Sequence, residues 1–189
     1  MRKLKLQMQI TLDGFVAGPN GEMDWLVWNW DEELQQYVGA LTESVDDILL
    51  GRVLAEGFIP TWKARADNPE TADAAAHTFV NLPKHVFSKT LITSEWENAS
   101  VVNGDLVAEV ERLKGQPGRD LIVYGGASFV SDLIKHNLID DYYLFVNPVA
   151  IGKGMPIFAS LDHKANLTLV EGKTFSCGII GLHYQPKHD

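Results

Sequence analysis

Two adjacent glycines, Gly125 and Gly126, carry the strongest chemical signal in the sequence, because they stand between an apolar run and a helical segment. Glycine has no Cβ, so another group can approach its backbone closely. The helix that follows presents unpaired backbone N–H groups and the positive end of its dipole. This pattern suits the pyrophosphate of a nucleotide, although a tight strand-to-helix turn without a ligand produces the same pattern.

Cations follow two other predicted strands. Arg52 comes directly after Gly51, and Lys89 lies between Ser88 and Thr90. One such cation is usually only solvated, but two at the same edge of a sheet as the glycine pair suggest a nucleotide site. An arginine near the adenosine ribose is the usual means of accepting a 2′-phosphate. The cations therefore indicate NADP rather than NAD.

A long glycine-containing loop runs from Asp13 to Trp25 and has the features of a lid over a bound ligand. Trp25, Trp28 and Trp30 lie close together at its end. These indoles either pack the loop against the next helix or form a wall for a flat heteroaromatic substrate. Both interpretations remain open.

Three acids, Asp31, Glu32 and Glu33, follow the tryptophans at the start of a predicted helix. Acids in a first helical turn are mostly solvated and stabilised by the helix dipole. One of them could instead face the cleft and bind or protonate an N-heterocycle. The six histidines show no metal-ligand spacing and Cys177 is the single cysteine, so no metal site is predicted.

The charge and hydropathy of the chain exclude several classes of protein. The 189 residues carry a formal net charge of −9, and the basic residues are scattered, which argues against a nucleic-acid partner. No apolar run approaches the roughly 20 residues of a membrane span, and no signal peptide is evident. We expect a cytoplasmic protein with a small-molecule substrate.

Hydrophobic periodicity predicts the elements that must position these residues. Alternating residues indicate a strand, continuous apolar runs indicate buried strands, and Ser176-Cys177-Gly178 indicates a hairpin turn. The predicted strands are Leu4–Leu12, Asp47–Leu50, Lys84–Phe87, Leu121–Tyr124, Tyr142–Val146, Leu167–Phe175 and Ile179–Tyr184. Helices are predicted after Asn29, over Thr71–Val80, after Asn103 and from Phe129 to near Asn137, and Gly57–Pro69 is predicted to be a loop.

The alternation of strands and helices predicts one α/β domain over residues 1–189. Its sheet should be mixed but mostly parallel, with helices on both faces and an antiparallel C-terminal hairpin at one edge. In open sheets of this class, ligands bind beyond the carboxyl ends of the strands. Every loop singled out above follows such an end.

Several motifs together resemble the dihydrofolate reductase superfamily, and most closely the RibD C-terminal domain family in its stand-alone bacterial form. The resemblance covers residues 4–184. It implies a three-layer α/β/α fold, NADPH as hydride donor, a role in riboflavin biosynthesis and a homodimer. The motifs are Thr11-Leu12-Asp13-Gly14-Phe15-Val16-Ala17, Leu50-Gly51-Arg52, Phe87-Ser88-Lys89-Thr90-Leu91, Gly125-Gly126-Ala127-Ser128, Leu138-Ile139-Asp140, Val146-Asn147-Pro148-Val149 and Gly152-Lys153-Gly154.

The resemblance also implies roles for matched positions. Val16 and Ala17 would lie near the nicotinamide. The adenosine phosphates would be held by Gly51, Arg52, Ser88, Lys89 and Thr90, and the pyrophosphate by Gly125, Gly126, Ala127, Ser128 and Phe129. Leu54 stands where the family often has a hydroxyl residue.

The substrate side is less well defined. We expect it to include Asp13, Trp25 and Trp30, with either Asp31 or Glu33 as the catalytic acid. Counting along the chain from Trp25 favours Asp31, whereas aligning the apolar stripe of the helix with the family favours Glu33. The main hypothesis is a reductase that acts on 5-amino-6-(5-phosphoribosylamino)uracil or a related pyrimidine or pterin. A dihydrofolate reductase-type enzyme and a nucleotide-binding module without turnover remain as alternatives.

Overall fold

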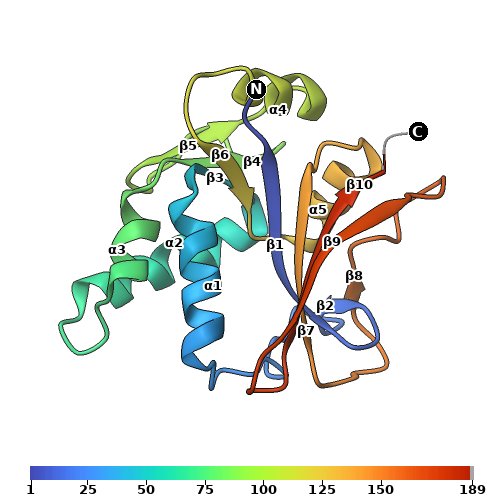
Figure 1. Cartoon of the computed structure of the whole chain (residues 1–189). Coiled ribbons are helices and arrows are strands. Elements are labelled where there is room, and N and C mark those ends of the chain that lie inside the picture. Colours follow the sequence, from blue (N-terminus) through green and yellow to red (C-terminus); the bar gives the residue numbers. More distant parts are fainter. Residues whose placement is uncertain (188–189) are drawn as a thin grey trace.

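An eight-stranded mixed sheet forms the centre of the molecule (Figure 1). The computed structural model describes residues 1–187 of the chain. The strand order is β5-β4-β3-β6-β1-β7-β10-β9, in which β10 pairs antiparallel with β7 and with β9 and all the other pairs are parallel. The strands are β1 Leu4–Thr11, β3 Val45–Gly51, β4 Lys84–Phe87, β5 Ala99–Val102, β6 Asp120–Val123, β7 Asp141–Asn147, β9 Leu167–Thr174 and β10 Ile180–Pro186.

Helices cover both faces of this sheet. One face packs against α1, α2 and α3, and the other packs against α4 and α5 (Figure 1). The helices are α1 Glu32–Glu43, α2 Arg52–Asp67, α3 Ala74–Asn81, α4 Leu106–Lys114 and α5 Ala127–Lys135. The predicted three-layer α/β/α fold, with its antiparallel C-terminal hairpin, is therefore confirmed.

The side chains of β1 explain why this strand lies in the middle of the sheet. Leu4 and Leu6 are fully buried against α4 and α5, together with Met8 and Ile10. On the opposite face of the strand, the Lys5 ammonium donates to the Ser44 hydroxyl at the end of α1 over 2.8 Å. Period-2 alternation places one set of residues on each face.

The predicted loop over Gly57–Pro69 is wrong, because α2 extends from Arg52 to Asp67. Ala55 and Ile59 have exposed fractions of 0% and 7%, and they face the core with helical spacing. Pro60 lies on the exposed side of the helix, where it removes one N–H group without preventing the packing. Burial of the apolar stripe outweighs the local cost of the proline.

The predicted starts of three helices need correction. Asp31, not Asn29, caps α1, and its carboxylate accepts a hydrogen bond from the Leu34 N–H at 2.8 Å. Asp105, not Asn103, caps α4. Helix α3 begins at Ala74 rather than at Thr71, because Asp73 caps it. An aspartate accepts from the N–H of a first-turn residue at each of these positions.

Three short strands were not predicted from the sequence. Strand β5 adds an outer strand beside β4. A separate two-stranded sheet joins β2, Phe15–Ala17, to β8, Met155–Pro156. These strands are too short for a periodic pattern to be evident. Within residues 1–187, no helix is long and apolar enough to cross a membrane.

Candidate functional site

The carboxyl ends of the parallel strands bring the predicted loops to one edge of the sheet. Gly51 at the end of β3 is aligned with Phe87 at the end of β4, directly before Ser88. The Gly51 N–H donates to the Gly125 carbonyl over 3.4 Å, which joins the loop after β3 to the loop after β6. The glycine pair and the two cation-bearing loops therefore lie side by side, as predicted from the strand order.

Two helix N-termini at this edge have no side-chain cap. Helix α2 begins after Gly51 and α5 begins after Gly126, and neither glycine can supply a capping oxygen. The other three helices are all capped by an aspartate. An ideal Cβ on Gly126 would lie 3.8 Å from the Gly51 Cα, so the two uncapped ends converge. Unpaired N–H groups and two positive dipole ends make this point attractive to an anion.

The glycine pair has conformations that other residues rarely adopt. The φ angles of Gly125 and Gly126 are 141° and 46°. An added Cβ on Gly51 would lie 2.9 Å from the Cβ of Phe129, whose ring stacks on Phe87 with centroids 4.9 Å apart. Part of the glycine requirement is therefore internal packing between the two loops, and part is free access to the backbone at the start of α5.

The two predicted cations differ in their surroundings. Arg52 forms an ion pair with Glu56 at 2.5 Å, one turn along α2, and its side chain is 39% exposed. Lys89 is exposed and has no ion pair within the described part of the chain. The Ser88 hydroxyl accepts from the N–H groups of Thr90 and Leu91 at 3.1 and 2.9 Å, so it shapes the loop that carries Lys89.

Asp13 ties the lid loop to the loop after β7. Its carboxylate accepts from the Thr11 hydroxyl at 2.7 Å, the Gly152 N–H at 2.7 Å and the Ile151 N–H at 3.1 Å. These hydrogen bonds, led by the one from Thr11, lower the pKa of Asp13. The side chain predicted for substrate contact thus holds two loops together as an ionised carboxylate.

Val16 and Ala17 are buried in β2, with exposed fractions of 4% and 8%. Their strand pairs with β8. Gly154 lies directly against the Ala17 carbonyl and the Phe15 side chain, where a Cβ would not fit. The close approach of this loop to β2 therefore explains why the motif Gly152-Lys153-Gly154 has a glycine at its third position.

A cavity of about 460 Å³ lies between the lid loop and the loop after β7, and Trp25 forms part of its wall. The indole N–H of Trp25 is buried and has no hydrogen-bond partner among residues 1–187. The Trp30 N–H is satisfied, because it donates to the Val27 carbonyl at 2.7 Å. Of the three clustered tryptophans, Trp25 has the donor that a ligand could use, whereas Trp28 is 76% exposed.

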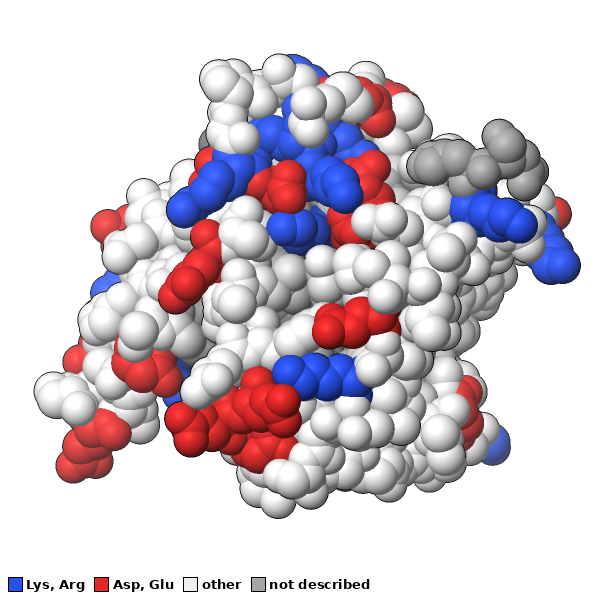
Figure 2. Space-filling view, in the orientation of Figure 1, with Lys and Arg blue, Asp and Glu red and all other residues white. Residues whose placement is uncertain are grey.

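The two predicted acids both contact the C-terminal hairpin. Besides capping α1, Asp31 accepts from the Ser176 hydroxyl at 2.8 Å and the Cys177 N–H at 3.2 Å. The hydrogen bond from the Leu34 N–H is the main cause of its lowered pKa. Glu33 is 61% exposed and pairs with Lys173 at 2.9 Å. Acidic side chains gather at the end of the molecule where α1 begins (Figure 2).

Asn147 is a site residue for which sequence analysis predicted no role. It is fully buried at the end of β7, and its side-chain Oδ1 accepts from the Val27 N–H at 3.0 Å. Its amide donates to Gln9 at 2.8 Å and to the Phe145 carbonyl at 3.1 Å. The signal was a polar residue before Pro148 at a strand end, which was noted only as part of a family motif.

The predicted residues therefore form two adjacent groups along the carboxyl edge. The glycines, Arg52 and Lys89 cluster at β3, β4 and β6, whereas the lid loop, Trp25 and Asp31 lie around β1, β7 and the C-terminal hairpin. The first group contains two uncapped helix N-termini and two cations, and in the second group the lid loop and Trp25 line a cavity. No group of three metal-ligating side chains occurs within the described residues.

Comparison with known protein families identifies a match over nearly the whole chain. The sequence model of the RibD C-terminal domain matches residues 2–181. The uncharacterized protein YyaP of Bacillus subtilis is 33% identical over 187 residues, which cover 97% of this chain and 94% of YyaP. The riboflavin biosynthesis protein RibD of Corynebacterium ammoniagenes is 25% identical over 82% of this chain and 45% of its own length.

Solved structures share the fold. A protein from Shewanella sp. PV-4 whose name refers to riboflavin biosynthesis superimposes with a TM-score of 0.75 at 21% identity, over the full length of both chains. The diaminohydroxyphosphoribosylaminopyrimidine deaminase/5-amino-6-(5-phosphoribosylamino)uracil reductase of Thermotoga maritima has a TM-score of 0.68 at 18% identity. That match covers 98% of this chain and 57% of the Thermotoga chain.

Proposed function

Because the chain belongs to the RibD C-terminal domain family, we propose that it is an NADPH-dependent reductase of the riboflavin-biosynthesis type. Its substrate would be a pyrimidine- or pterin-like heterocycle. One observation carries the cofactor assignment: the uncapped N-termini of α2 and α5 converge at Gly51 and Gly126, beside Arg52 and Lys89. Two helix dipoles and two cations at one point favour a ligand with several phosphate charges.

Different residues at this edge would bind different parts of the cofactor. Unpaired N–H groups in the first turn of α5, from Ala127 to Phe129, would donate to the pyrophosphate. Arg52 and Lys89 would bind the adenosine phosphates, and Arg52 would exchange its exposed partner Glu56 for phosphate oxygens. A guanidinium can contact phosphate through two parallel N–H groups, which gives geometry as well as charge.

The nicotinamide half of the cofactor, where the reaction takes place, would lie beside the lid loop. Bound NADPH supplies a hydride, and the substrate gains that hydride at an electrophilic carbon and a proton at a neighbouring atom. Val16 and Ala17 would form an apolar wall beside the nicotinamide, and the Trp25 N–H would donate to the substrate. Because its pKa is lowered, Asp31 is ionised at neutral pH and would orient a ring N–H rather than donate a proton.

The cofactor assignment is tested by titrating NADPH and NADH into the protein and into Arg52→Gln. A hydrogen bond between charged groups contributes about 1.5–3 kcal/mol. We therefore expect the wild type to prefer NADPH by about tenfold or more, and Arg52→Gln to lose most of that preference. Arg65→Gln is a matched control, because Arg65 is also an exposed, ion-paired arginine, at the other end of α2. Equal affinities of the wild type for both cofactors would refute this assignment.

Turnover is tested separately by following NADPH oxidation with 5-amino-6-(5-phosphoribosylamino)uracil and with dihydrofolate. Oxidation with the uracil compound supports the riboflavin-type reductase. Oxidation with dihydrofolate alone would assign the chain to the folate type. Tight NADPH binding without oxidation by either compound would leave a nucleotide-binding module.

A further inference from the structure

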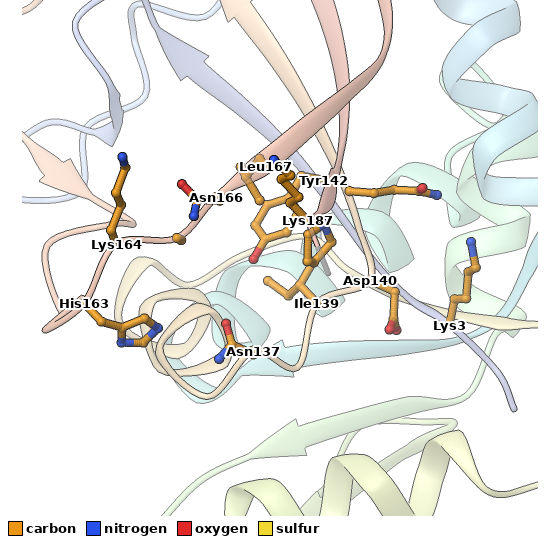
Figure 3. A pocket seen from close by; sticks show the side chains of 13 residues that line it. Lys3, Asn137, Ile139, Asp140, Tyr142, His163, Lys164, Asn166, Leu167 and Lys187 are labelled. Carbon is orange, nitrogen blue, oxygen red and sulfur yellow. The ribbon is translucent and has the colours of Figure 1, made fainter. Parts of the chain in front are cut away.

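A second cavity lies at the opposite edge of the sheet, where the parallel strands begin (Figure 3). It has a volume of about 530 Å³ and lies between the start of β7, the segment before β9 and the end of β10. A strand rises roughly 3.3 Å per residue, so the seven residues of β7 separate this cavity from the candidate cofactor site by about 20 Å. Its volume is within the usual range for small-molecule sites.

A buried phenol points into this cavity. Tyr142 has an exposed fraction of 3%, and its hydroxyl has no hydrogen-bond partner among residues 1–187. The oxygen is directed into the space between Ile139 and Asn166 (Figure 3). Burial, with a smaller effect from Asp140, raises the pKa of Tyr142 to about 12, so the hydroxyl keeps its proton and can donate.

The rim of the cavity is basic, although the chain as a whole has a net charge of −9. Lys3, Lys164 and Lys187 lie around it. Lys3 forms an ion pair with Asp141 at 3.2 Å, whereas Lys164 and Lys187 have no ion pair within the described residues. The one carboxylate in the lining, Asp140, is neutralised by Lys114 at 2.6 Å. Among the residues that line the cavity and that the structure describes, the uncompensated charge is therefore positive.

The walls of the cavity are partly apolar, since Ile139, Leu167 and Pro186 lie beside the phenol. We propose that this cavity is a second ligand site, which binds a small organic anion with a flat apolar body. The anionic end would lie at the lysine rim, the body would pack on the apolar wall, and an oxygen of the ligand would accept from Tyr142.

The test is a calorimetric titration with phenyl phosphate, benzoate and the neutral analogue benzyl alcohol. We expect one or both anions to bind and the alcohol to bind at least tenfold more weakly. Tyr142→Phe should lower the affinity for the anion about tenfold or more, since it removes a hydrogen bond to a charged group. The thermal midpoint of Tyr142→Phe should not fall, because the hydroxyl has no partner in the empty protein.

Controls separate this site from the cofactor site and from non-specific attraction. Lys164→Gln combined with Lys187→Gln should weaken anion binding about tenfold, and Lys63→Gln on α2 should leave it unchanged. Arg52→Gln should also leave it unchanged. Binding of neither anion, binding insensitive to Tyr142→Phe and to the double lysine variant, or binding lost in Arg52→Gln would each overturn the proposal.

Discussion

Several aspartates of this chain accept hydrogen bonds from backbone N–H groups through their carboxylates. Asp31, Asp73 and Asp105 cap helices, and Asp13 holds the loop after β7. Against this background, the glycines that precede α2 and α5 are exceptional, because they leave first-turn N–H groups without a side-chain acceptor. A phosphate is the natural acceptor for such groups.

Gly126→Ala tests whether the start of α5 must remain open. The φ of Gly126 is 46°, so a side chain there causes backbone strain in addition to any obstruction of a ligand. Gly21→Ala is the matched control, because Gly21 has a φ of 91° and an open surrounding in the lid loop. We expect both variants to lower the thermal midpoint, but only Gly126→Ala to weaken NADPH binding, by at least about tenfold. Unchanged affinity in folded Gly126→Ala would make the glycine purely structural.

Asp31→Asn separates the capping role of this residue from a role in substrate binding. Asparagine caps helices about as well as aspartate, so the start of α1 should persist while the charge is lost. We expect KM for the substrate to rise about tenfold or more, with NADPH affinity unchanged. Glu33→Gln is the paired variant. If it alone raises KM, the acid is Glu33, and if neither does, no first-turn acid contacts the substrate.

At the scale of elements, the lid loop is held from two sides. Asp13 binds it to the loop after β7, and the buried Asn147 binds the segment that directly follows it, through Val27. Asn147 is also bound to Gln9 of β1, so the ends of two central strands and the lid form one hydrogen-bonded unit. Trp25 lies in the chain between these two attachment points and forms part of the cavity wall.

Asn147→Leu should break this unit. The substitution keeps a similar volume, but it leaves the Val27 N–H and the Gln9 side-chain Oε1 without their partner. Unsatisfied buried groups cost about 1–3 kcal/mol each, so we expect the free energy of unfolding to fall by about 2 kcal/mol or more in a urea titration. Asn81→Leu, at the exposed end of α3, should change it by less than about 0.5 kcal/mol. A loss no larger than that of Asn81→Leu would argue against this network.

Across the whole molecule, the two edges of the sheet differ in their polar groups. The amino edge is joined by ion pairs, including Arg2 with Asp46 and Asp47 and Lys5 with Asp120 at 2.8 Å. Basic and acidic side chains interleave there, at the top of the view in Figure 2. The carboxyl edge has open helix ends and loops instead. The ion pairs thus join neighbouring strands at the amino edge, where the second cavity also lies.

From the ionised carboxylate of Asp141 at the amino edge, we expect the protein to lose stability in acid. Burial opposes ionisation of Asp141, but hydrogen bonds from Gln185 and His183 and the pairing with Lys3 outweigh it, and the pKa of Asp141 is lowered. A carboxyl with a lowered folded pKa stabilises the protein fully above its unfolded pKa, near 3.8. That stabilisation is lost as the pH falls through the folded pKa. We expect urea unfolding to show falling stability below about pH 4.

Asp141→Asn checks the source of this effect. The variant should be less stable at pH 7, and its stability should decline less steeply in acid, because it lacks one proton-binding carboxylate. Asp67→Asn, whose partner Lys63 lies on the exposed surface of α2, is the control. An acid profile of Asp141→Asn that parallels the wild type would show that other groups control the decline.

The sequence by itself determined the layers of the fold and which loops meet at the carboxyl edge of the sheet. Alternation in Leu4–Leu12 and the apolar run Leu121–Tyr124 required buried strands, and loops after parallel strands must share an edge. The resemblance, confirmed by the family match, identified the RibD-type domain. These features depend on local periodicity and on short motifs, both of which are readable along the chain.

Only the tertiary structure decided which neighbours each side chain has. Pro60 lies inside a helix because Ala55 and Ile59 are buried against the sheet, a gain that the local sequence does not reveal. Asp31 contacts the hairpin turn at Ser176, 145 residues away in the sequence, and Asn147 meets Val27 across a separation of 120 residues. Such contacts depend on strand order and register, because these bring distant segments together.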